Sequence, residues 1–154
     1  MKIISGGQTG ADLGGLEGAE LAGVETGGTA PSNFYTEAGS NYVLRDKYNL
    51  VAKGTFKSRT VQNIIDSDGT VIFSDKLDSS GTICTVNNCR AQHKPYLCNP
   101  TVEELLGFIS FHKIEVLNVA GNRESVAPGI QKRTRETIYK VLTSEKIVDD
   151  RWIE

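Results

Sequence analysis

The chain has 154 residues, a formal net charge of −2 and a sequence pI near 5.7. This length favours one domain over residues 1–154, with enough chain for a sizeable hydrophobic core. The charge provides no basic field for duplex nucleic acid or for an acidic membrane surface. Because the sequence has neither an 18-residue apolar run nor an apolar leader, we expect a cytoplasmic protein without a membrane partner.

The cysteines predict neither a metal centre nor a disulfide framework. Cys84, Cys89 and Cys98 are separated by four and eight residues, and the chain has only two histidines. These spacings match no common zinc site, and an odd number of cysteines leaves at least one thiol unpaired. We therefore expect three reduced thiols and no metal-binding residues.

A glycine-rich loop follows the first predicted strand, over residues 1–5, and precedes a helical pattern that ends near residue 22. Such a loop can aim unpaired N–H groups and a positive helix end at an anion, most often a phosphate. The same glycines could instead allow strand and helix to pack closely. Asp12 is expected to serve as a helix cap or first-turn acid, or to bind a ligand hydroxyl or amine. The candidate residues here are Gly6, Gly7, Gln8, Thr9, Gly10 and Asp12.

Residues 24–66 contain the least regular part of the sequence. A short strand over residues 24–26 precedes a second glycine pair that includes Gly28, another candidate for close approach to a ligand. Residues 32–57 are interpreted as a long loop that covers the site, because loops of this length are usually functional. Its aromatic residues either stack on a ligand ring or pin the loop to the body, and pinning is favoured.

The next helix is predicted over residues 58–66 with Ser58 as its cap. Arg59 then lies in the first turn, where the helix dipole disfavours a cation. Two interpretations stay open: Arg59 meets an anion there, or it is a solvated surface residue.

The second half of the chain repeats the order of strand, small polar loop and helix. Strands are predicted over residues 70–74, 95–98 and 114–120, and helices over 83–91, from a cap at Asn99 or Thr101, and from 129 to 142. The tail over residues 149–154 is expected to be exposed apart from Trp152. Candidate residues in the two loops are Ser80, Gly81, Thr82, Gly121, Asn122, Arg123 and Glu124.

Alternating strands and helices predict an α/β, Rossmann-like fold with a mostly parallel sheet and helices on both faces. In such a sheet the three strand-to-helix loops meet at the carboxyl edge, where ligands bind. Backbone donors with Thr9, Ser80 and Thr82 would hold the phosphates of a nucleotide-like anion, and Arg123 would clamp it. Glu124 would orient Arg123 or bind ribose or amino groups.

The loops match neither standard nucleotide fingerprint. The first lacks the Lys-Ser/Thr ending of a Walker motif, and a dinucleotide-type glycine pattern with a downstream acid is missing. Asp12, Glu124 and Asp75 are the acids that could carry out acid–base chemistry, and we assign none of them a catalytic role. The sequence therefore favours a protein that holds its ligand without turning it over.

The chain resembles the family named putative molybdenum carriers, in the Rossmann-like group that includes LOG phosphoribohydrolases and nucleotide-sensing SLOG domains. The resemblance rests on Ser-Gly-Gly-Gln-Thr-Gly-Ala-Asp at 5–12, Ser-Gly-Thr at 80–82 and Asn-Val-Ala-Gly-Asn-Arg-Glu-Ser at 118–125. Shorter matches lie at residues 27–28 with 31, 59–60 with 63, 66–68 and 127–130.

The resemblance implies an oligomeric carrier, a dimer or tetramer, for the molybdenum cofactor, which is a pterin with a phosphate. Two alternatives stay open. The first is a sponge or sensor that sequesters a nucleotide immune second messenger, either a cyclic nucleotide or an ADP-ribose derivative. The second is a LOG-like nucleotide phosphoribohydrolase, although Thr85 stands where the catalytic glutamate of those enzymes falls.

Overall fold

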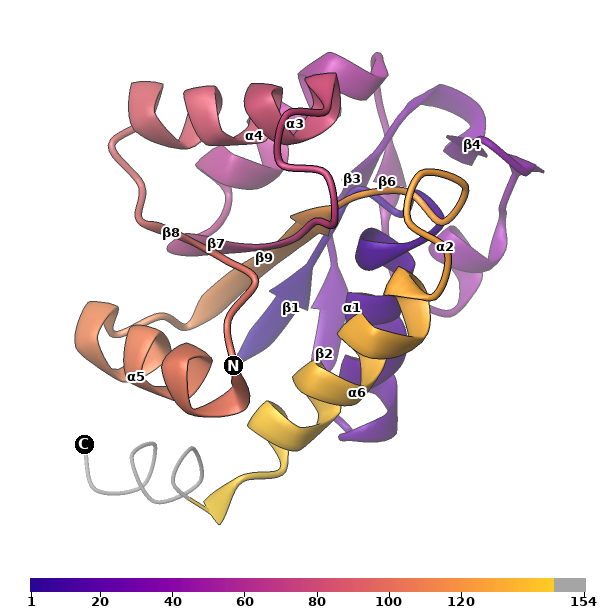
Figure 1. Ribbon diagram of the computed structural model, residues 1–154. Helices are drawn as coiled ribbons and strands as arrows, with labels where there is room; N and C mark the ends of the chain where they lie inside the picture. The colour runs from indigo at the N-terminus through magenta and orange to yellow at the C-terminus, as the bar shows by residue number, and fades with distance from the viewer. Residues whose placement is uncertain (146–154) are drawn as a thin grey trace.

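A five-stranded parallel sheet forms the centre of the fold in the computed structural model, which describes residues 1–145 (Figure 1). The strand order is β2-β1-β9-β7-β8, and every pairing within this sheet is parallel. This confirms the predicted α/β, Rossmann-like class. The strands are β1 (Lys2–Ile4), β2 (Glu25–Gly27), β7 (Gly69–Phe73), β8 (Tyr96–Cys98) and β9 (Val116–Gly121).

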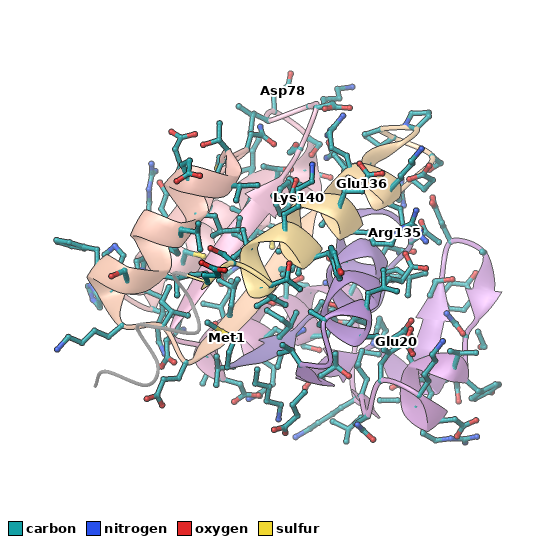
Figure 2. The ribbon with its side chains drawn as sticks, turned by 90° about the horizontal axis from the view of Figure 1, so that it is seen from below. Met1, Glu20, Asp78, Arg135, Glu136 and Lys140 are labelled. Carbon is teal, nitrogen blue, oxygen red and sulfur yellow. The ribbon has the colours of Figure 1, made fainter. Side chains whose placement is uncertain are left out.

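Helices cover both faces of the sheet, as predicted (Figure 1). One layer contains α1 (Ala11–Leu21), α5 (Val102–His112) and α6 (Ile130–Leu142), and the other contains α3 (Phe56–Ile65) and α4 (Ser80–Ala91). Figure 2 shows α6 lying alongside α1. A Cβ atom on Gly14 of α1 would lie 2.4 Å from the Gln131 carbonyl oxygen of α6, so this close helix pair requires glycine there.

The main hydrophobic core lies between the sheet and the layer of α1, α5 and α6. Strand residues such as Ile3 and Leu117 are fully buried there against Leu105 and Ile138. Thr101 caps α5, because its hydroxyl accepts the Glu104 N–H at 3.1 Å while the Glu104 carboxylate accepts the Thr101 N–H at 2.9 Å. This reciprocal capping box explains the sharp start of the helix.

Residues 32–57, expected to be a loop, are instead built from short elements. They contain a 3₁₀ turn (Ser32–Phe34), β4 (Tyr35–Thr36), β5 (Gly39–Ser40), α2 (Val43–Asp46) and β6 (Val51–Ala52). Strand β6 pairs in parallel with β3 (Thr29–Ala30).

This segment has a hydrophobic core of its own. Its buried residues are Phe34, Leu44, Tyr48 and Leu50, which pack against Leu16 of α1. Burial of these side chains stabilises the segment, which has little regular secondary structure. The predicted pinning role is confirmed for Phe34 and Tyr48. It does not extend to Tyr35 and Tyr42, which are exposed.

Helix α3 begins three residues earlier than predicted, because its cap is not Ser58. Thr55 is its cap, and Ser58 is the third helical residue of a capping box: its N–H donates to the Thr55 hydroxyl at 3.2 Å. The prediction for Trp152 falls outside the described residues. Within residues 1–145, no helix is long and apolar enough to cross a membrane, and all three cysteines are free.

Candidate functional site

The three loops after β1, β7 and β9 meet at the carboxyl edge of the sheet. The Ala11 N–H of the first loop donates to the Asn122 carbonyl oxygen of the third at 3.0 Å. The Asn122 N–H in turn donates to the Phe73 carbonyl oxygen, at the end of β7, also at 3.0 Å. The loops are therefore one hydrogen-bonded unit, as the parallel topology predicts.

Asn122 joins the second loop to the third through its side chain. Its Oδ1 accepts the Asp75 N–H at 2.8 Å and the Ser74 hydroxyl at 2.9 Å. Its Nδ2 donates to the hydroxyls of Ser79 and Thr82 at 3.2 and 3.4 Å. Since the buried Thr82 hydroxyl is engaged in this network, it positions the loops and is not free to bind a phosphate.

A cavity of about 400 Å³ opens beside these loops, between the first turns of α3 and α4. Its volume is within the range that holds a small-molecule ligand. Two helices and all three loops contribute to its wall. The lining residues are Gln8, Phe56, Lys57, Arg59, Thr60, Ser79, Ser80, Gly81, Thr82, Cys84, Gly121, Asn122, Arg123 and Val126.

The predicted site residues divide into two groups around this cavity. Those that line it are Gln8, Arg59, Ser80, Gly81, Thr82, Gly121, Asn122 and Arg123. Those that do not are Gly6, Gly7, Thr9, Gly10, Asp12, Gly28 and Glu124. The glycine-rich first loop thus contributes only Gln8 to the wall.

The first loop is filled by protein atoms and not left open for a ligand. A Cβ atom on Gly6 would lie 2.2 Å from Nη1 of Arg59, and one on Gly10 would lie 2.4 Å from the Asn122 carbonyl oxygen. Gly10 also has φ near +84°, which favours glycine. These glycines serve close packing, the alternative that the sequence left open, because neighbouring residues occupy the space a phosphate would need.

Arg59 does meet an anion, but that anion is Asp12. Its Nη1 lies 3.3 Å from the buried Asp12 carboxylate, and the Arg59 side chain is only 14% exposed, so it is not a solvated surface residue. Burial raises the pKa of Asp12, and the Arg59 cation and the Gln8 N–H offset this only in part. Nε of Arg59 is buried and has no hydrogen-bond partner among residues 1–145.

The chain's own carboxylates neutralise the N-termini of α1 and α6. Asp12 accepts the Gln8 N–H at 3.2 Å at the start of α1. Glu124 accepts the N–H groups of Gly129 and Gln131 at 2.8 and 3.0 Å at the start of α6. Glu124 therefore caps a helix and does not orient Arg123. The partial positive charge of these two helix ends is already balanced.

The N-termini of α3 and α4 are different, because the side chains that cap them are the hydroxyls of Thr55 and Ser79 and not carboxylates. In α4 the Ser79 hydroxyl accepts the Thr82 N–H at 3.4 Å, so the earlier N–H groups of Ser80 and Gly81 have no partner within the helix. A Cβ atom on Gly81 would meet no atom within 4 Å. The open space of the site is therefore at α4, not at the first loop.

The cavity wall is cationic. Lys57, Arg59 and Arg123 line it, and none of its described lining residues is an aspartate, glutamate or histidine. Lys57 makes no ion pair with any of residues 1–145, whereas Arg59 is paired with Asp12. Arg123 is paired as well, with Glu37, so the two helix N-termini and Lys57 are the groups that favour an anion in the cavity.

Glu37, which the sequence did not indicate, connects the β4–β5 turn to the first and third loops. Its carboxylate accepts the hydroxyls of Thr9 and Ser125 and the Ser125 N–H, and it lies 3.5 Å from Nε of Arg123. Burial alone would raise the pKa of Glu37, but the hydrogen bonds from Ser125 and Thr9 outweigh it and lower that pKa. Arg123 is therefore paired with Glu37 and not with Glu124.

The sequence profile of the Circularly permutated YpsA SLOG family matches residues 3–142. The chain belongs to this family. It is also similar to a crystal structure described as a putative molybdenum carrier protein from Syntrophus aciditrophicus SB. The two are 32% identical, with a TM-score of 0.80 over 93% of this chain and 94% of the other. None of the curated proteins matches the sequence.

Membership of the SLOG family confirms the resemblance predicted from the sequence. Four of the matching segments meet at the cavity, those that contain Gln8, Arg59, Gly81 and Asn122. Reasoning from sequence missed Phe56 and Lys57 because it placed the start of α3 too late. Four further lining residues were also missed, namely Thr60, Ser79, Cys84 and Val126.

Proposed function

We propose that this protein is a non-catalytic carrier that binds a phosphorylated, nucleotide-like small molecule in the cavity between α3 and α4. The observation that carries the proposal is the sign of the charge around the cavity. The first turns of α3 and α4 contain no acid, and Lys57, Arg59 and Arg123 line the same cavity. An anion is the ligand that such a wall stabilises.

Each part of the wall has a role in holding a phosphate. The N–H groups of Ser80 and Gly81 would bind its oxygens, as at other helix N-termini. Arg59 would add charge-assisted hydrogen bonds from the guanidinium donors that Asp12 leaves unused. The Gln8 side chain uses its Oε1 to accept the N–H groups of Thr9 and Glu37, which leaves its NH₂ group for the ligand.

The lining residues support holding over hydrolysis. General acid–base catalysis needs a titratable group within hydrogen-bond reach of the ligand. The three carboxylates on which such chemistry would fall have other partners: Asp12 pairs with Arg59, Glu124 caps α6, and Asp75 pairs with Arg133. The phosphoribohydrolase alternative is therefore not favoured.

The molybdenum cofactor belongs to the ligand class that we propose, because it combines a phosphate with a pterin ring. The donors around the cavity suit phosphate oxygens, so such cargo would be held through its anionic group. A sponge or sensor for a cyclic nucleotide or an ADP-ribose derivative would use the same donors. We further propose, from the family resemblance, a dimer or tetramer, which light scattering in solution tests.

Calorimetry with a ligand panel tests the proposal. The panel contains nucleoside monophosphates and diphosphates, cyclic dinucleotides, ADP-ribose and a phosphorylated pterin. We expect at least one to bind with an affinity that falls as salt rises, and to be recovered intact after denaturation. Free base in the recovered material would show hydrolysis, and binding to none of the panel would overturn the proposal.

Two matched lysines locate the site. Lys57 lines the cavity, whereas Lys53, which is also exposed, does not. Lys57→Gln should weaken binding and reduce its salt dependence, and Lys53→Gln should leave both unchanged. Cys84 gives an independent readout, because bound ligand should slow its alkylation by iodoacetamide relative to that of Cys98, which is outside the cavity.

A further inference from the structure

Phe56 is an aromatic residue that the packing of its own helix does not explain. It is the first residue of α3, lines the cavity and is 43% exposed. The buried residues of α3 are Asn63 and Ile64, two turns further along. Leaving a phenyl ring in water costs free energy in proportion to its exposed apolar area, so an occupant that covers the ring would be stabilised.

Tyr35 supports the Phe56 ring from the side. The two ring centroids are 6.1 Å apart and the planes meet at 60°, an edge-to-face arrangement. Tyr35 belongs to β4, and the following turn carries Glu37, which is bound to Thr9 and Ser125. The hairpin thus limits the orientations of Phe56, and a preorganised ring binds a flat partner at a lower entropic cost.

The cavity has a second apolar residue from a different part of the chain. Val126, in the loop after β9, lines the cavity and is partly exposed. The remaining lining is mostly polar or cationic, and it includes the α4 N-terminus at Ser80 and Gly81. The wall therefore combines anion donors with two apolar groups, which is the pattern expected for a ligand that is charged at one end and apolar at the other.

We propose that Phe56 is a stacking platform for a heteroaromatic ring, and that this ring and the anionic group belong to the same ligand. This inference rests on the proposed function and names its ligand class. The ligand is a phosphorylated heteroaromatic compound, such as a nucleotide or a phosphorylated pterin, and not a sugar phosphate or an inorganic oxyanion. Stacking on aromatic side chains tolerates different bases because every base presents a π-face.

A pair of ligands that differ only by the ring gives the test. AMP and ribose 5-phosphate carry the same phosphorylated ribose, and GMP extends the comparison to a second base. Calorimetry on the full chain should show AMP or GMP binding about tenfold or more tightly than ribose 5-phosphate. The ratio of the nucleotide affinity to the ribose 5-phosphate affinity should decrease several-fold in Tyr35→Leu, because this substitution removes the supporting ring.

Variants of Phe56 assign the effect to this residue. Phe56→Ala should lower the affinity for the nucleotide about tenfold and leave that for ribose 5-phosphate unchanged, and Phe56→Tyr should retain binding. Phe111→Ala is the matched control, because Phe111 is 81% exposed on α5 and does not line the cavity. Phe56→Leu serves the same purpose if the alanine variant is not folded, as judged by its thermal transition.

The outcomes separate this inference from the proposed function. If ribose 5-phosphate binds as well as the nucleotides, or if Phe56→Ala weakens both ligands equally, the stacking role is overturned while the anion site stands. If no member of the wider ligand panel binds, AMP, GMP and ribose 5-phosphate included, the anion site itself is refuted and the stacking role with it.

Discussion

Replacing Gly81 by alanine should raise the stability of the protein while it weakens ligand binding. Gly81 is the second residue of α4, and a Cβ atom there would meet no atom within 4 Å. The backbone conformation is one that alanine also adopts, because no positive φ occurs at this position. The substitution therefore costs nothing sterically in the unliganded protein.

The stability effect comes from the unfolded chain. Alanine has fewer accessible backbone conformations than glycine, so Gly81→Ala should stabilise the fold by about 0.4–1 kcal/mol. For a chain of this size that corresponds to a rise in melting temperature of about 1–4 °C. Thermal unfolding followed by circular dichroism measures this directly.

The binding effect has the opposite sign because the new methyl group would lie over the N–H groups at the start of α4. Losing one charge-assisted hydrogen bond to a phosphate would weaken binding by about tenfold or more. Calorimetry with the best ligand of the panel measures the loss. A variant that is more stable yet binds with wild-type affinity would refute the role of the α4 N-terminus as the anion site.

Three other variants probe the contacts around the site. Gly6→Ala should lower the free energy of unfolding by about 3 kcal/mol, because its Cβ atom would displace the Arg59 guanidinium from Asp12; an unchanged urea midpoint would contradict this. Because burial raises the pKa of Asp12, wild-type stability should fall as pH rises from the ordinary pKa through the raised one. Asp12→Asn should abolish that decline in urea titrations at a series of pH values. The pKa of Glu37 is lowered, so the stability from its ionised form is present above the ordinary pKa and lost as pH falls through the lowered one. Glu37→Gln should remove this acid-side loss, and a melting-temperature profile that matches the wild type would argue against the contact with Ser125.

The sequence predicts much of the fold because its signals are local. Short, mostly apolar runs indicate the five strands, several of them rich in β-branched residues, and apolar spacing indicates the helices that follow them. Alternation of the two then requires a parallel sheet, so the loops near Gly10, Gly81 and Asn122 must share one edge. All five predicted strands occur in the sheet, with shifts of one or two residues at their ends.

Residues 32–57 escaped prediction because their elements are short and are stabilised from outside. Leu44 and Leu50 do not follow a helical or strand period, and they are buried in a cluster that includes Leu16 of α1. Glu37 was missed for the same reason, because its carboxylate accepts a hydrogen bond from Ser125, a residue 88 positions further along the chain. No local pattern encodes a contact at that separation.

What the sequence by itself determined is the parallel sheet and the carboxyl edge at which its loops meet; only the tertiary structure decided which helix N-terminus at that edge is left for the anion that we propose. The glycine-rich first loop had the strongest signal, yet Arg59 fills it and Asp12 neutralises the helix behind it. Glu124 does the same for α6. At Ser80 and Gly81 the cap is the Ser79 hydroxyl and no acid lies in the first turn. Which helix ends receive a carboxylate depends on how distant side chains pack.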